Sequence, residues 1–198
     1  GRDLDQQDSI SASFKRLFKN KVYRRGVVAQ FFYVGAQTCV WSFTIRLVMQ
    51  ETTMREAQAS VVYLVAIIGF CMSRFIYTWL MKWIAPVKLL LFGGLTSLLM
   101  TIIVVLSAGT GWLLISALVL ISFFMSLMFP TIYGLALKDI TCGAYPSDAK
   151  IGASCLIMAI LGGALITPLQ GIVSDNTTIY LSYIVPTICF AIVSLYAL

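Results

Sequence analysis

The chain has 198 residues, of which 60% are hydrophobic and only 11% are charged. A soluble domain carries about 25% charged residues, so this composition excludes an ordinary water-soluble protein and predicts an integral membrane protein. The net charge of +6 does not indicate a nucleic-acid partner, because the basic residues alternate with long apolar stretches instead of forming one patch.

The beginning of the chain is polar and charged and precedes the apolar part. We expect residues 1–21 to form a cytoplasmic inter-domain loop that ends in an amphipathic surface helix, with Phe14, Leu17 and Phe18 on its apolar side. Residues 22–198 would then form a six-helix membrane domain. The chain begins at Gly1 without a signal-peptide pattern, and we expect it to be part of a longer protein.

Six apolar stretches approach the ~20 residues that a helix needs to span hydrocarbon. They run approximately over Tyr23–Val48, Ala59–Trp83, Val87–Ala108, Trp112–Lys138, Ile151–Val173 and Tyr180–Leu198. Each is too long and unbroken for a barrel strand, so the predicted fold is all-α with six transmembrane helices. Basic residues precede the first span and flank the second-to-third and fourth-to-fifth connections. By the positive-inside rule, both chain ends face the cytoplasm, as in a multi-pass protein of a bacterial inner membrane.

The first span carries a stripe of polar and aromatic side chains in an otherwise apolar helix. At 100° per residue, its members fall within about a quarter of the circumference. They are Gln30, Tyr33, Gln37, Trp41 and Thr44. Lipid satisfies no hydrogen bond, so such a stripe must face water, a ligand or another helix.

The second span contains one charged residue, Arg74, toward its cytoplasmic end. Two interpretations stay open. Either the side chain extends to the membrane surface, or it pairs with another helix or half in one conformational state and so acts as a latch. The third span is apolar all round, which predicts a peripheral, lipid-facing helix.

The fourth span carries a second stripe. Its members are Ser122, Met125, Ser126, Phe129 and Tyr133. Pro130 removes a backbone donor and frees a carbonyl one turn earlier, so it predicts a kink. A kinked, aromatic-lined helix suits the wall of a cavity; the alternative is that these aromatic side chains only pack against neighbouring helices.

The fifth span is rich in small residues that let helix backbones approach closely, and Thr167–Pro168 predicts a bend in it. The sixth span is mostly apolar and is expected to be peripheral, like the third. In chain order, spans one and four are striped, spans three and six are peripheral, and spans two and five lie between them, which is a pattern of three helices repeated as three. An inverted-repeat carrier half would show this pattern.

The chain lacks the side chains that most catalysis and metal binding require. It contains no histidine, and its acidic residues all fall in predicted loops or at helix ends. It has no Ser–His pair, no metal-ligand cluster and no glycine-rich phosphate loop with its lysine. These absences argue against an enzyme, a metal site or a cofactor. They also place the proton-binding carboxylate of any symporter outside this chain.

Four sequence blocks follow one another at intervals along the chain. They are YVGAQTCVWSFTIR (Tyr33–Arg46), SRF followed by TWL (Ser73–Leu80), FMSLMFPTIYGLALK (Phe124–Lys138) and ITPLQGIVSD (Ile166–Asp175). In this order they resemble the C-terminal half of the fucose:proton symporter family of the major facilitator superfamily. The first block looks more like that of the L-fucose permeases than that of the glucose/galactose carriers, which tend to have an acidic residue where this chain has Gln37. One departure is Phe129, where L-fucose permeases often have tyrosine.

The resemblance implies helices seven to twelve of a twelve-helix carrier that works by alternating access. It implies a sugar and a proton as partners, a bilayer, and a missing N-terminal six-helix half that carries the proton-binding acids. We therefore expect secondary active transport, specifically L-fucose:proton symport. A glucose/galactose transporter of the same family and a non-transporting six-helix scaffold are the alternatives.

The two striped spans would line the central sugar cavity of such a carrier. The residues expected to bind the sugar are Gln30, Tyr33, Gln37, Trp41, Ser126, Phe129 and Tyr133. Arg74, Pro130 and Pro168 are expected to act in conformational change or inter-helix contact.

Overall fold

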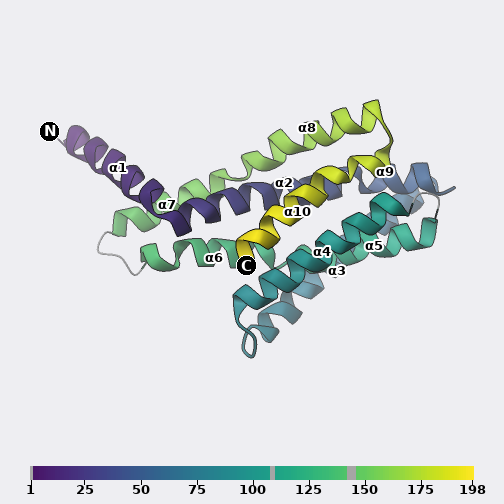
Figure 1. Cartoon of the computed structure of the whole chain (residues 1–198), viewed down its shortest axis with the longest axis horizontal. Helices are drawn as coiled ribbons and strands as arrows, with labels where there is room; N and C mark the ends of the chain where they lie inside the picture. Colours follow the sequence, from purple (N-terminus) through teal and green to yellow (C-terminus); the bar gives the residue numbers. More distant parts are fainter. Residues whose placement is uncertain (1, 108–109, 142–145) are drawn as a thin grey trace.

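The computed structural model describes residues 2–107, 110–141 and 146–198, and within these residues every regular element is an α-helix. The helices are α1 (Arg2–Lys19), α2 (Lys21–Glu51), α3 (Glu56–Leu80), α4 (Pro86–Leu106), α5 (Gly111–Met125), α6 (Met128–Thr141), α7 (Pro146–Met158), α8 (Leu161–Asn176), α9 (Ile179–Ser182) and α10 (Ile184–Ala197). Figure 1 shows them as one elongated bundle, with the last turns of α2, α4 and α8 at the same end. The predicted all-α architecture is confirmed.

Three of the predicted spans are each built from two helices with a short break between them. In the fourth span, α5 and α6 are separated at Ser126–Leu127, and in the sixth, α9 and α10 meet at Tyr183. Each break lies one turn before a proline, Pro130 or Pro186. A proline donates no backbone hydrogen bond, and its ring clashes with the carbonyl four residues earlier. The kink predicted from Pro130 is therefore confirmed.

The break in the fifth span lies at Ala159–Ile160, whereas α8 continues through Pro168. The predicted bend at Thr167–Pro168 is thus not where the helix is interrupted. The break directly precedes Gly162–Gly163, and glycine is a weak helix former. A side chain at Gly162 would overlap the backbone carbonyl of Phe31, so this part of the span is fixed by its close approach to α2.

Five helical segments among the described residues are long and apolar enough to cross a membrane. They are Glu56–Leu80, Pro86–Leu106, Gly111–Lys138, Asp148–Asn176 and Ile179–Ala197. The first predicted span, now α2, is not among them, although its 31 residues exceed the ~20 needed. Its polar stripe lowers its hydropathy. A helix that other helices surround does not need an apolar surface on every side.

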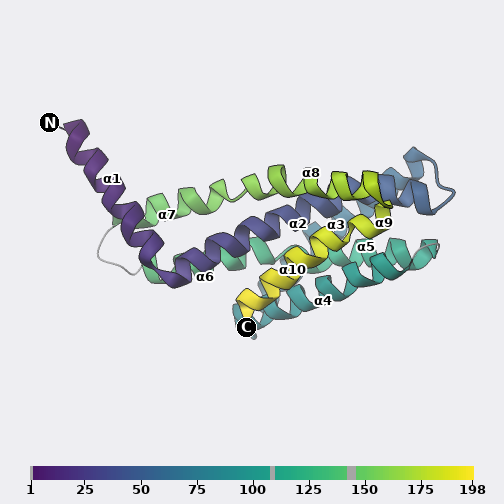
Figure 2. The ribbon, with the colours of Figure 1, turned by 45° about the horizontal axis from the view of Figure 1, so that its top comes forward.

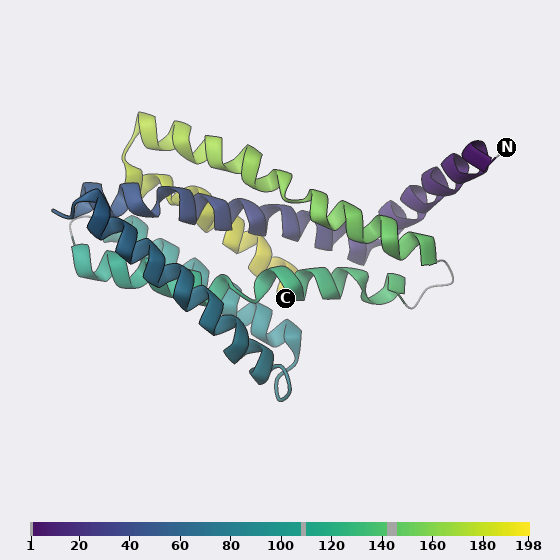
Figure 3. The same cartoon turned by 180° about the vertical axis from the view of Figure 1, so that it is seen from behind.

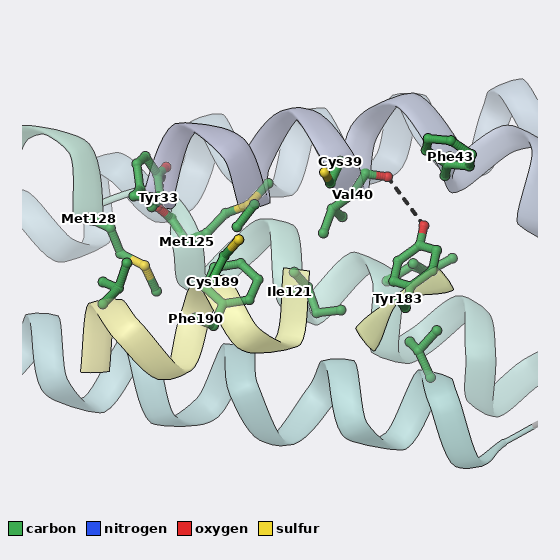
Figure 4. Packing of buried hydrophobic residues seen from close by; sticks show 14 of the residues in the cluster. Tyr33, Cys39, Val40, Phe43, Ile121, Met125, Met128, Tyr183, Cys189 and Phe190 are labelled. Atoms are coloured by element: carbon green, nitrogen blue, oxygen red, sulfur yellow. Dashed lines mark hydrogen bonds between the residues drawn. The ribbon is translucent and has the colours of Figure 1, made fainter. Parts of the chain in front are cut away.

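Helix α2 is the centre of the bundle (Figure 2), where α8, α10, α6 and α3 all pack against it. Buried side chains of α2, α5 and α10 interdigitate along it, as Figure 4 shows for Tyr33, Met125 and Phe190. The Tyr183 hydroxyl donates a hydrogen bond to the Val40 carbonyl over 3.3 Å. The core is therefore built around the helix that carries the polar stripe.

The two helices beside α2 that are least covered are α3 and α8. Only 17% of the apolar window of α3 is buried, against 39% for α4 and 44% for the α9–α10 segment. In Figure 3 α3 lies in front, where it packs on α5 and α2 and no other described helix lies over it. The third and sixth spans, predicted to be peripheral, are thus better covered within this chain than α3 is.

Helix α1 packs against α7 at the end of the bundle where α2 begins. Leu17 is buried there, and the Arg16 guanidinium donates two hydrogen bonds to the Asp148 carboxylate at 2.9 and 2.7 Å. Phe14 and Phe18 stack on each other and remain exposed. Of the predicted apolar side of this helix, only Leu17 is covered by the described residues.

Candidate functional site

The polar stripe of α2 lies along the boundary between its buried and its open surface. Gln30, Tyr33 and Thr44 are at most 2% exposed, whereas Gln37 and Trp41 are partly exposed. The Thr44 hydroxyl is satisfied by the Val40 carbonyl of its own helix. Within the stripe, Gln37 and Trp41 are therefore the side chains that a molecule beside α2 can reach.

The break between α5 and α6 packs directly against this stripe. The Tyr33 hydroxyl donates a 2.8 Å hydrogen bond to the carbonyl of Met125, which is the last residue of α5. The ring centroids of Tyr33 and Phe129 are 6.4 Å apart. The Ser73 hydroxyl of α3 donates to the Ser126 hydroxyl within the break. The Met125 carbonyl, at the end of α5, thus accepts a hydrogen bond from α2, and Ser73 of α3 bonds to the same break.

Trp41 belongs to a row of side chains that crosses from α2 to α3. The Trp41 and Phe70 rings meet edge to face with their centroids 5.0 Å apart, and the Arg74 guanidinium carbon lies 6.0 Å from the Phe70 ring centroid. Phe70 precedes Arg74 by one turn on the same helix, so the guanidinium lies back along α3, and the Arg74 side chain remains exposed. Extension to the membrane surface and the latch both stay predictions for Arg74.

Several polar atoms around the stripe are buried without a hydrogen-bond partner in the described structure. Both amide atoms of Gln30, the indole nitrogen of Trp41 and the hydroxyl of Thr131 are in this state. A buried polar group without a partner costs about 1–3 kcal/mol. Such groups concentrate where a ligand, ordered water or another protein segment completes the structure.

The structure does not bring every predicted residue to this place. Tyr133 packs on a second cluster with Tyr23 and Leu156, toward the end where α2 begins. Pro130 and Pro168 are exposed, and Pro130 lies one turn after the α5–α6 break. Of the predicted residues, Tyr33 and Phe129 meet at the α5–α6 break, where Ser126 is bonded to Ser73, while Trp41 contacts Phe70 of α3.

Sequence reasoning overlooked Ser73 and Thr131 and gave Phe70 no role at the site. A serine in an apolar helix, next to the only arginine of its span, was the available signal for Ser73. No corresponding signal marks Phe70, because one more phenylalanine on an apolar helix is indistinguishable from a lipid-facing one.

No titratable acid of the described residues lies at the stripe. Glu51, Glu56, Asp148 and Asp175 all fall in the first or last turns of their helices, as predicted. No group of three or more possible metal ligands occurs among the residues that the structure describes. The site consists of neutral hydrogen-bonding groups, aromatic faces and one arginine.

No protein-family model matches the chain. It is 37% identical, over 97% of its length, to the L-fucose-proton symporter of Escherichia coli, and 38% identical over 96% to that of Haemophilus influenzae. It is 35% identical over 99% to a putative glucose/galactose transporter of Helicobacter pylori. The chain spans 43–48% of the length of these relatives.

Two crystal structures share its fold. One is of the E. coli fucose:proton symporter FucP, and one is of FucP, a major facilitator superfamily transporter, in the outward conformation. Both have a TM-score of 0.87 and 36% identity, and they cover 94% of this chain and 44% of the solved chain. The chain is a homologue of the fucose:proton symporters and corresponds to their C-terminal half. These homologues are transporters, not enzymes.

Proposed function

We propose that this chain is one half of a secondary active carrier that moves a hexose together with a proton, with L-fucose as the preferred substrate. The observation that carries the proposal is the placement of Gln37 and Trp41 on the open edge of an otherwise buried polar stripe. An amide both donates to and accepts from sugar hydroxyls, and an indole face packs on the C–H side of a pyranose.

The remaining predicted residues take different parts in this proposal. Tyr33, Ser126 and Phe129 hold the α5–α6 break against α2 and so set the shape of the sugar site. Gln30, with both amide atoms unpartnered, is proposed to bind the sugar through water or after a rearrangement. Tyr133 would contact sugar only near the cytoplasmic side, and Pro168 is proposed to help α8 bend during the cycle.

The second half of the carrier is proposed to cover the apolar faces that this chain leaves open. Exposed side chains on α3 include Leu64, Ile68 and Phe75, and α8 exposes Leu165, Leu169 and Ile172. These two helices flank α2 on either side of the sugar-contact residues. A six-helix partner that packs on both would close a cavity over the stripe, as alternating access requires.

The coupling proton is proposed to bind in that second half. The described polar groups of this site are neutral apart from Arg74, and the chain contains no histidine. The basic residues then orient the protein in a bacterial inner membrane with both ends of this chain in the cytoplasm.

Counterflow with labelled sugars on the intact carrier tests the proposal. Proteoliposomes loaded with L-fucose should accumulate labelled L-fucose but little labelled glucose or galactose. The reverse preference would identify the second candidate, a glucose/galactose carrier, which the 35% identical relative favours. No exchange of any sugar would support the scaffold alternative.

A further inference from the structure

A groove separate from the polar stripe runs between the start of α2 and the end of α10. It encloses about 550 Å³ and is lined by Arg24, Arg25 and Val28 of α2 and Ile192, Leu195 and Tyr196 of α10, among others. A second cavity of about 300 Å³ shares Arg25 and Tyr196 and extends to the first turn of α4 and the last part of α6. At 100° per residue, Arg25 lies about 120° around α2 from the centre of the stripe.

The cationic end of this groove has hydrogen-bond donors without acceptors. Neither Arg24 nor Arg25 has an acidic or hydrogen-bonding side-chain partner among the described residues, and both are exposed. The Tyr196 hydroxyl also has no partner there, and it lies 3.4 Å from the position that a side-chain carbon on Gly26 would occupy. Two guanidinium groups and one hydroxyl thus converge on one opening.

The rest of the groove is apolar and leads away from these charges. Val28 lies about one turn beyond Arg24 and Arg25 along α2 and is 47% exposed, and Leu195 of α10 is 70% exposed. Charged groups therefore stand at the end of the bundle, and the apolar lining continues toward its middle. A soluble anion would use only the first part, whereas a molecule with an anionic head and a hydrocarbon tail would use both.

We propose that this groove binds an anionic phospholipid of the cytoplasmic leaflet. The Arg24 and Arg25 N–H groups donate to the phosphate oxygens, and the Tyr196 hydroxyl donates to a headgroup oxygen. One acyl chain lies along Val28, Ile192 and Leu195. Forked guanidinium donors match phosphate geometry, and basic pockets between transmembrane helices on the cytoplasmic side are suited to anionic headgroups.

Native mass spectrometry of the intact carrier tests this assignment. The protein is purified from nanodiscs that contain phosphatidylglycerol and phosphatidylcholine, and the retained lipids are identified. Wild-type carrier should retain phosphatidylglycerol. The double variant R24Q/R25Q should bind it roughly 30-fold more weakly, from about 1 kcal/mol per cationic side chain near the membrane surface.

The matched control is K15Q/K19Q, which removes two exposed charges from the same end of the chain without touching the groove. It should retain the lipid like the wild type, and equal loss in both double variants would overturn the proposal. If R24Q/R25Q does not insert, R24K/R25K keeps the charge but loses the forked geometry. Weaker retention than in the wild type is then expected, and unchanged retention would overturn the site.

One further result would assign the groove to another occupant. Displacement of the lipid by excess inorganic phosphate would indicate a soluble-anion site and would exclude the lipid assignment.

Discussion

The two sides of α2 are built in opposite ways. On the side of α8, small residues bring the backbones into contact: side chains added at Gly35 or Gly162 would overlap Ile166 or the Phe31 carbonyl, and one at Gly163 would come within 2.8 Å of Thr38. On the side of α3 and the α5–α6 break, polar atoms of Gln30 and Trp41 are buried without partners. The first side is closely packed within this chain, whereas the second leaves polar atoms of the stripe that no described residue satisfies. This difference locates the site better than any single residue does.

The largest effect is expected when a side chain is added at the close contact between α2 and α8. Gly162→Ala places a methyl group onto the Phe31 backbone, which cannot move as a side-chain end can. Such overpacking costs about 1–3 kcal/mol and sometimes more. We expect a strongly lowered unfolding temperature of the purified carrier, measured by fluorescence in detergent.

The control for this prediction is Gly134→Ala on α6, where no atom of another group lies within 4 Å. Alanine is the better helix former by about 1 kcal/mol, so the unfolding temperature should stay the same or rise. Equal destabilisation by both substitutions would show that close packing of α8 on α2 is not what distinguishes this side.

The second prediction concerns the polar side. Gln37→Ala and Trp41→Ala should weaken sugar uptake far more than Phe31→Ala or Phe43→Ala, which lie off the stripe. Loss of a hydrogen bond to a buried hydroxyl costs about 1–3 kcal/mol, or roughly 5- to 150-fold in affinity. Initial uptake rates at matched expression measure the difference. Equal rates in all four variants would contradict the assignment of this side to sugar.

These two sides differ in how far the sequence predicts them. The stripes of α2 and the fourth span follow from helical periodicity, and the break before Pro130 follows from a local backbone rule, so both are readable along the chain. The break in the fifth span cannot be predicted along the chain, because it lies beside Gly162–Gly163, where the helix closely approaches α2. The Ser73–Ser126 contact and the separation of Tyr133 from the site depend on how helices cross, which no pattern within one helix contains.

The third prediction tests the row from Trp41 through Phe70 to Arg74. If the Arg74 guanidinium latches the two halves in one state, Arg74→Ala should lower the rate of uptake severalfold but leave sugar affinity of the purified carrier nearly unchanged. Uptake and equilibrium binding, measured on the same preparation, separate the two effects. An affinity loss as large as the rate loss would make Arg74 part of the sugar site instead.

A smaller effect is expected where the polar side is already satisfied. Tyr33→Phe removes the hydroxyl that donates to the Met125 carbonyl and leaves this carbonyl unpaired at the break. A cost of about 1 kcal/mol in unfolding free energy follows, which lowers the unfolding temperature slightly. Tyr63→Phe on α3 is the control, since its hydroxyl has no hydrogen-bond partner among the described residues. An identical response to both changes would mean that the Tyr33 bond does not support the break.

The smallest effect is expected for the described acids of this half, because none of them lies at the polar side of α2. Asp148 of α7 pairs with Arg16 of α1. At the opposite end of the bundle, a carboxylate oxygen of Asp175 lies 3.7 Å from a guanidinium nitrogen of Arg46. Neutralising them in the intact carrier as Asp148→Asn and Asp175→Asn should leave the pH dependence of sugar uptake unchanged between about pH 5 and 8, where no unperturbed side chain of this histidine-free chain titrates. Uptake is measured with and without an imposed proton gradient, and the ratio of the two rates should equal that of the wild type. The Arg46–Asp175 pair is exposed and contributes little to stability, so Asp175→Asn should also keep the total rate. Asp148 is mostly buried against Arg16, so a lower total rate of Asp148→Asn with an unchanged ratio reflects weakened packing of α1 on α7. If the ratio falls toward one in either variant, proton coupling passes through this half, and the polar side of α2 cannot be the neutral sugar surface that its geometry indicates.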